Sequence, residues 1–249
     1  MKIVLLGHDD LPSLYALQRV IEDAPQHRYV AFFSGELPRS AEMPRDLAEL
    51  ARIDAHLCTR LRQSGRLARP LLEARELPQP NSAAGREILE ALAPDLIVSI
   101  RYRRILRDAV LAIPPHGVLN LHSGVLPDYK GVMATFWAML HGVETIGATL
   151  HRIIDAGIDT GPVIGIRRIA ADYGSTYLAN VLRLYDPGCE LVTAALQAIA
   201  AAKKPAATPQ KPGGRYFSTP GPADLEEFRE RGLRLADGCE WAYLELRKT

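Results

Sequence analysis

The sequence is poor in cysteine, in aromatic residues and in long apolar runs. Its 249 residues include three cysteines, Cys58, Cys189 and Cys239, which lie far apart and form no C-x-x-C pair. This spacing argues against a disulfide framework or a zinc site, so we expect reduced thiols and no bound metal. The N-terminal apolar run, Ile3–Leu6, is too short for a signal peptide or a membrane span. We therefore expect a cytoplasmic protein without membrane contact.

An excess of either charge is also absent. The chain has 30 basic and 29 acidic residues, a formal net charge of +1, and a hydrophobic content of 47%. This balance provides no broad positive field for a polyanion, which argues against a nucleic-acid partner and favours a small-molecule substrate. The length and apolar content suffice for one large α/β domain, or for one domain with a small appendage.

Strand-like and helix-like segments alternate through most of the chain. This alternation is typical of a Rossmann-like α/β fold, with a mostly parallel sheet and helices on both faces. Pro187 and Gly188 fall inside the last long helical pattern and predict a kink or a split there. We expect strands near 2–6, 28–35, 95–102, 118–122, 145–154 and 162–170, and helices near 11–24, 41–69, 82–92, 104–115, 133–141 and 175–202.

The composition changes at 201–214, where Pro, Lys, Ala and Gly dominate. We interpret this stretch as a linker or a crossing arm. The expected division is a catalytic domain over 1–202, followed by a linker and a small C-terminal extension over 203–249. A short strand at 215–218 and a helix at 222–232 follow. We expect the aromatic residues of the extension either to pack back on the chain or to form a homodimer contact.

One strand carries polar residues where an apolar run is expected. Asn120 and His122 are two residues apart in Val118–His122 and therefore share a face, at the carboxyl end where open parallel sheets bind ligands. The later loop "DAGIDTG" adds two carboxylates, Asp155 and Asp159. An amide, an imidazole and a carboxylate form a coherent acyl-transfer set. The alternative is that Asn120 and His122 are hydrogen-bonded polar groups of the core.

No nucleophile accompanies this set. Ser123 is adjacent, but its side chain is expected on the opposite face of the strand, and the sequence contains no G-x-S-x-G motif. Direct attack by an incoming amine, or by an activated water, would account for this.

Near the end of the first strand, Asp9 and Asp10 either cap the following helix or bind an ammonium group or sugar hydroxyls.

Several separated motifs then point to one family. The segments "NLHSGVLPDYKG", "WAMLHG", "GATLHRIIDAGIDTG" and "PVI", preceded by "APDLIVSIRYRRIL", closely resemble the signature of folate-dependent formyltransferases, in the same order. The resemblance is tight from about Ala93 to Ile164. It implies a Rossmann-like fold, N10-formyltetrahydrofolate as co-substrate, and formyl transfer to a primary amine. It assigns Asn120, His122 and Asp159 as the catalytic residues.

The same resemblance implies where the pterin of the co-substrate binds. It assigns backbone groups near Arg104 and Leu106 in "RYRRIL", and near Ile154, Asp155 and Gly157 around the "DAGIDTG" loop. Asp155 is either a member of this pterin loop or an ordinary turn aspartate. Lys130 is expected either at the glutamate tail of the folate or on the solvated surface.

The acceptor is narrowed by differences from individual members of that family. The enzymes acting on glycinamide ribonucleotide carry a Gly/Ser/Asn-rich phosphate loop after the first strand, whereas this chain has "GHDDLPS". The tRNA enzymes carry a further basic β-barrel, and only a short extension is expected here. We therefore favour a nucleotide-linked amino sugar. The alternatives are an amino-acid-type amine such as hydroxyornithine, formyltetrahydrofolate hydrolysis, or the methionyl-tRNA and glycinamide ribonucleotide reactions.

Overall fold

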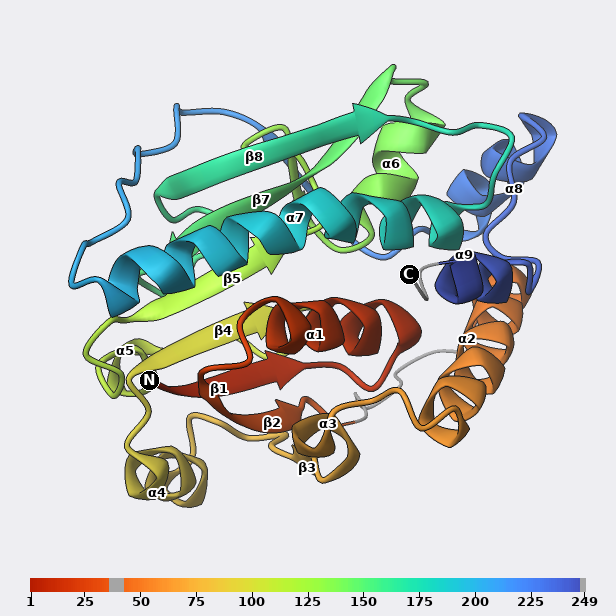
Figure 1. Cartoon of the computed structure of the whole chain (residues 1–249). Coiled ribbons are helices and arrows are strands. Elements are labelled where there is room, and N and C mark those ends of the chain that lie inside the picture. The colour runs from red at the N-terminus through yellow and green to blue at the C-terminus, as the bar shows by residue number, and fades with distance from the viewer. Residues whose placement is uncertain (36–42, 247–249) are drawn as a thin grey trace.

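The computed structural model describes residues 1–35 and 43–246, arranged around one twisted sheet (Figure 1). The sheet has seven strands in the order β3-β2-β1-β4-β5-β7-β8. The first five in this order run parallel, and β7 and β8 are antiparallel. The strands are β1 (Lys2–Gly7), β2 (Arg28–Phe33), β3 (Arg75–Glu76), β4 (Leu96–Ile100), β5 (Val118–His122), β7 (Thr145–Ile153) and β8 (Val163–Ala170). The mostly parallel sheet predicted from the sequence is confirmed.

Helices cover both faces of the sheet, as predicted. One face packs against α1 (Leu11–Asp23) and α7 (Tyr177–Ala200), where Leu5 and Leu121 belong to the larger apolar cluster. The opposite face packs against α4 (Ala83–Leu92) and α5 (Asp108–Leu111). The remaining helices are α2 (Arg45–Gln63), α3 (Arg69–Leu72), α6 (Ala134–Leu140), α8 (Pro222–Glu230) and α9 (Glu240–Leu246). The start of the helix predicted at 41–69, residues 41 and 42, lies outside the described residues.

Side chains fix where the main helices begin. Asp10 accepts a hydrogen bond from the backbone N–H of Ser13 and caps α1, and Ser82 caps α4 in the same way. Thr176 caps α7. Each cap satisfies a backbone donor that has no partner within its own helix.

The helix α7 runs without interruption from Tyr177 to Ala200, so of the predicted kink or split at Pro187–Gly188 the split does not occur. Gly188 faces the sheet, where an added Cβ would lie 2.9 Å from the Cβ of Ala148 on β7. The missing side chain therefore lets α7 lie directly on β5 and β7. We infer that this packing holds the helix together, although Pro187 lacks a backbone N–H to donate.

The C-terminal extension lies against the rest of the chain. Its strand β9 (Arg215–Phe217) pairs in parallel with β6 (Tyr129–Gly131) to form a second, two-stranded sheet. The guanidinium carbon of Arg60 lies 4.1 Å from the ring centroid of Trp241, and Leu244 is buried. Phe217 and Phe228, two aromatic rings considered for a dimer contact, are buried within their own chain. The boundary at residue 202 and the homodimer stay predictions.

Candidate active site

Asn120 and His122 lie on one face of β5, as the alternation of strand side chains predicts. Val118, on the same face, belongs to the apolar cluster under α4 and α5, whereas Leu119 and Leu121 belong to the cluster under α1 and α7. The His122 side chain is buried, and Asn120 is half-buried. The two polar groups therefore occupy the face of the sheet that the loop after β7 can cover.

Asp159 joins them from that loop. Its Oδ2 lies 3.4 Å from His122 Nδ1, and its Oδ1 lies 3.4 Å from Asn120 Nδ2. The backbone N–H of Gly131 donates to Oδ2 at 2.8 Å. The structure thus brings together the amide, the imidazole and the carboxylate that the motifs single out, from segments that are distant in the sequence.

The carboxyl group of Asp159 is held in its ionised form. Burial raises its pKa, but the charge of His122 and the hydrogen bond from the N–H of Gly131 outweigh burial, and the pKa falls to about 2. Asp159 also has a φ of +54°, in the left-handed region that a residue with a Cβ rarely adopts. Such backbone strain concentrates at functional sites and persists only where the surroundings enforce it.

The ring of His122 lies between two hydrogen-bond acceptors. Its Nε2 is 2.6 Å from the carbonyl oxygen of Tyr129, and its Nδ1 faces the carboxylate of Asp159. A carbonyl and an ionised carboxylate only accept hydrogen bonds, so the doubly protonated imidazolium is the form that donates to both. The arrangement therefore suits a histidine that carries a proton into a reaction.

The sequence analysis missed His151, which completes the cluster. His151 is paired with Asn120 in the antiparallel β5–β7 register, and its Nε2 lies 2.9 Å from Asn120 Nδ2. Its Nδ1 lies 3.1 Å from the carbonyl oxygen of Arg152, so this nitrogen donates while Nε2 accepts the amide proton. His151 thereby orients the amide of Asn120. The alternation of "GATLHRII" predicts a strand that contains His151, but it does not show that His151 lies opposite Asn120. That pairing follows only from the register between β5 and β7.

Two comparisons with known proteins identify the family. A family model described as formyl transferase matches residues 18–195. The chain belongs to this family. It is 32% identical to the methionyl-tRNA formyltransferase of Mycobacterium avium (strain 104) over 200 residues, or 80% of this chain and 58% of that protein. It is 37% identical to that of Thermus thermophilus over 164 residues, or 63% of this chain and 51% of that protein. The chain thus spans between half and three fifths of these two curated relatives.

Solved structures of other formyltransferases share the fold. A sugar N-formyltransferase from Shewanella aligns with a TM-score of 0.62 and 14% identity over 95% of this chain and 89% of that chain. A formyltransferase from Anoxybacillus kamchatkensis aligns with a TM-score of 0.55 and 21% identity over 92% of this chain and 90% of its own. The second structure is a complex with tetrahydrofolate and UDP-4,6-dideoxy-4-formamido-L-AltNAc. At these identities the likeness concerns the Rossmann-like fold.

In this member of the family, the residues predicted to bind the pterin lie on two segments. Arg104 donates from Nε to the carbonyl oxygen of Ser34 at 3.0 Å, and Leu106 is buried. Ile154 is 58% exposed. Asp155 accepts from the N–H of Gly157 at 2.7 Å in a tight turn. These five assignments stay predictions.

A shared apolar cluster brings the two segments to the same face of the sheet. Leu106 is part of the cluster under α4 and α5, and Ile153, the residue before Ile154, packs against that cluster. Arg103, Arg104 and Arg107 also line a surface depression of about 640 Å³ together with residues 78–82. A ligand bound here would lie next to cationic side chains.

The carboxyl ends of β1 and β4 are closed by an internal ion pair. Arg101 donates from Nε and Nη2 to Asp10 at 3.0 and 2.9 Å, and Arg103 lies 3.2 Å from the same oxygen. Burial raises the pKa of Asp10, but the two arginines outweigh it and bring the pKa to about 2. Asp9 pairs with Arg62. Of the two predicted roles, Asp10 therefore takes the helix-capping one, and its charge is already neutralised by Arg101.

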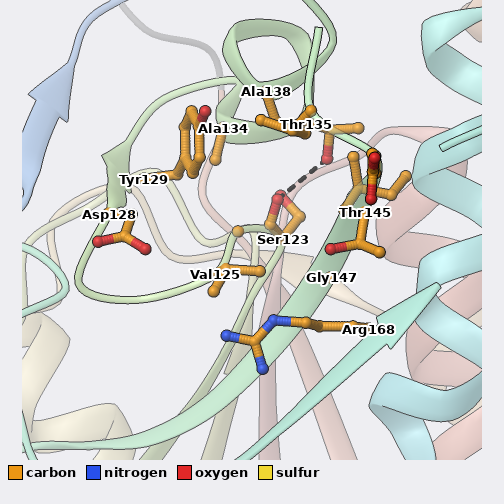
Figure 2. Close-up of a pocket in the computed structure, with 14 residues that line it drawn as sticks. Ser123, Val125, Asp128, Tyr129, Ala134, Thr135, Ala138, Thr145, Gly147 and Arg168 are labelled. Carbon is orange, nitrogen blue, oxygen red and sulfur yellow. Dashed lines mark hydrogen bonds between the residues drawn. The ribbon is translucent and has the colours of Figure 1, made fainter. Parts of the chain in front are cut away.

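A separate pocket lies between the segment that follows β5 and residues of α6, β7 and β8 (Figure 2). It has a volume of about 290 Å³, with Ser123 at its centre and Arg168 of β8 at one side. Thr135 of α6 donates to the carbonyl oxygen of Ser123 at 3.0 Å. Asn120, His122 and Asp159 do not line this pocket.

Among the described helices, none is long and apolar enough to cross a membrane.

Proposed function

We propose that this protein transfers the formyl group of N10-formyltetrahydrofolate to a primary amine of a small molecule. The observation that carries the proposal is the convergence of Asn120, His122 and Asp159, with contacts of 3.4 Å from the carboxylate to each of the other two side chains. Membership of the formyl transferase family supports the same reaction.

The donor set fits a bound formyl group. When bound, the co-substrate supplies an electrophilic formyl carbon and a nitrogen leaving group. The Nδ2 of Asn120 makes one short bond, to His151 at 2.9 Å, and one long contact, to Asp159 at 3.4 Å. The second amide proton is therefore weakly held and can donate to the negative charge that develops on the formyl oxygen. One such donor contributes roughly 3 kcal/mol to stabilising the transition state.

His122 and Asp159 handle the protons in this proposal. An arylamine nitrogen leaves poorly unless it is protonated. His122 would donate this proton from Nδ1, whose contact with Asp159 is a long 3.4 Å, and would regain one from the attacking amine as the bond to the formyl carbon forms and the bond to the leaving nitrogen breaks. Asp159, with a pKa of about 2, stays ionised and holds the imidazolium through the 3.4 Å contact to Nδ1. The attacking amine then provides the nucleophile that the chain itself lacks.

We favour a nucleotide-linked amino sugar as the acceptor. The fold likeness to the Shewanella sugar N-formyltransferase extends over 95% of this chain, including much of the C-terminal extension. The formal net charge of +1 also favours a small acceptor over a polyanion. The predicted cytoplasmic location would place the enzyme with the folate pool, and it stays a prediction.

A panel assay tests the acceptor class. Purified protein is incubated with N10-formyltetrahydrofolate and, in separate reactions, nucleotide-linked amino sugars, hydroxyornithine and glycinamide ribonucleotide, and each amine is examined by mass spectrometry. We expect formylated amino sugar. Formate release without any amine would instead indicate a hydrolase, and the absence of every product would overturn formyl transfer.

Methionyl-tRNA is the second candidate acceptor, because both curated relatives described above are named methionyl-tRNA formyltransferases. The same assay with charged initiator tRNA separates the two. Faster formylation of methionyl-tRNA than of every amino sugar would replace the sugar assignment and leave the formyl-transfer proposal intact.

A further inference from the structure

Two of the three proposed catalytic side chains, His122 and Asp159, are held by the backbone of β6. The carbonyl oxygen of Tyr129 accepts from His122 Nε2 at 2.6 Å, and the N–H of Gly131 donates to Asp159 Oδ2 at 2.8 Å. Among the described strands, β6 pairs with β9 in a separate two-stranded sheet. The support of the site therefore depends on a strand of the C-terminal extension.

The contact between β6 and β9 is close and sterically demanding. Gly131 has a φ of +94°, and an added Cβ would lie 2.2 Å from the carbonyl oxygen of Phe217. The N–H of Val132 donates to that same oxygen at 2.8 Å. The ring of Phe217 is buried and stacks on Tyr129 with a centroid separation of 5.5 Å. Together these contacts fix the position of the β6 backbone.

The arm before β9 holds the other side of the Asp159 loop. Gln210 donates from Nε2 to the carbonyl oxygens of Asp159 and Gly161, at 2.8 Å in each case. Both partners are acceptors, so the amide nitrogen must face them. Thr208 and Val163 exchange two backbone hydrogen bonds of 2.8 Å, which anchors the arm beside Gln210. The left-handed conformation of Asp159, with its φ of +54°, is thus clamped from outside its own loop.

We propose that Gln210 and strand β9 support the catalytic apparatus, with Gln210 as a positioning residue for Asp159. The proposal rests on the function proposed above. Gln210 acts through the carbonyl groups of Asp159 and Gly161, and β9 acts through Tyr129 and Gly131 of β6. A displacement of a catalytic group by about 1 Å lowers turnover by roughly a hundredfold, so the loss of this clamp affects chemistry before it affects binding.

Three variants in the full-length protein separate positioning from general stability. Gln210→Ala removes both hydrogen bonds, and Gln210→Glu keeps the shape but places a carboxylate against two carbonyl oxygens. Lys211→Ala changes an exposed neighbour on the same arm and is the matched control. We expect kcat to fall at least tenfold in both Gln210 variants with KM for the folate within about threefold, and the control to match wild type.

The pH profile adds a signature that a merely structural role would not produce. The side chain of Gln210→Glu regains one donor when it is protonated, so its kcat relative to wild type is expected to rise as the pH falls from 7 to 5, whereas that of Gln210→Ala is expected to stay constant. A kcat for Gln210→Ala within twofold of wild type would overturn the proposal.

Hydrogen exchange tests the clamp without using activity. Peptides covering 154–161 are expected to exchange faster in Gln210→Ala than in wild type or Lys211→Ala, at conditions where all three are folded. Equal exchange in this loop overturns the positioning role. If loop 154–161 exchanges faster in Gln210→Ala but the wild-type protein transfers no formyl group, the proposed function is overturned and the positioning role of Gln210 is kept.

Discussion

At the scale of single residues, the sequence identifies the reacting groups better than it identifies their supports. Asn120, His122 and Asp159 stand in recognisable motifs, and the structure brings them together. His151 and Gln210 were not predicted. The role of His151 depends on the register of two antiparallel strands, and that of Gln210 on where a proline-rich arm crosses the surface. Neither is encoded in local spacing.

Removal of the imidazole of His122 is the first prediction at this scale. His122→Ala is expected to lower kcat by roughly a hundredfold or more, because it removes both the proton donor and the partner of Asp159, while KM for the folate changes little. Steady-state kinetics with the best acceptor measures this. His116→Ala, at an exposed histidine, is the control, and near-normal turnover of the His122 variant would refute its role.

The carboxyl group of Asp159 gives a pH-dependent prediction. Its pKa is about 2 in the folded protein against an ordinary value of 3.8, so folding favours the ionised form. This contribution, roughly 2 kcal/mol, is present above about pH 4 and is lost as the pH falls toward 2. The free energy of unfolding of Asp159→Asn, from urea titrations between pH 5 and 3, is therefore expected to fall less steeply on acidification than that of wild type. Parallel slopes would contradict the assignment.

At the scale of elements, local rules fail where tertiary contacts override them. The alternation of strands and helices was correct. Of the kink or split predicted at Pro187–Gly188, the split is excluded, since α7 is continuous. The strand β6 was not predicted, because Tyr129–Gly131 follows a turn and finds its partner, β9, far along the chain. Short segments of this kind become strands only when a distant partner supplies the hydrogen bonds.

The packing of α7 on the sheet yields the prediction for this scale. Gly188→Val is expected to lower the free energy of unfolding by about 1–3 kcal/mol, because its side chain would overlap Ala148 and approach Leu121. Urea denaturation followed by circular dichroism measures it. Ala194→Val, on the exposed face of the same helix, should change stability by only a few tenths of a kcal/mol. Equal effects of both variants would contradict the close approach of α7.

At the scale of the whole molecule, the question is whether the C-terminal extension is an appendage or an integral part. Composition predicted a boundary at residue 202, because the arm that follows resembles a linker. The structure describes an arm held by backbone bonds at Thr208 and a tail with Leu244 only 1% exposed, and the boundary itself stays a prediction. A composition change marks where regular structure ends, but it carries no information on what the chain then contacts.

Cooperative unfolding tests this view. Leu244→Ala is expected to lower stability by about 2–5 kcal/mol, as truncation of a fully buried leucine does, and to shift one single transition of the whole chain. Far-UV circular dichroism during urea denaturation follows this, with the exposed Glu245→Ala as control. A separate early transition of small amplitude, with the main midpoint unchanged, would restore the extension as an independent unit.

The central claim is that Asn120, His122 and Asp159 act together on one formyl carbon, and a double-mutant cycle of formyl transfer tests it most directly. Turnover with isotope-labelled N10-formyltetrahydrofolate is measured for wild type, Asn120→Ala, Asp159→Asn and the double variant. Groups that act as a unit are not additive, so the double variant should lose little more than the worse single variant. Losses that multiply, or a wild type that transfers no label to any amine, would contradict the account.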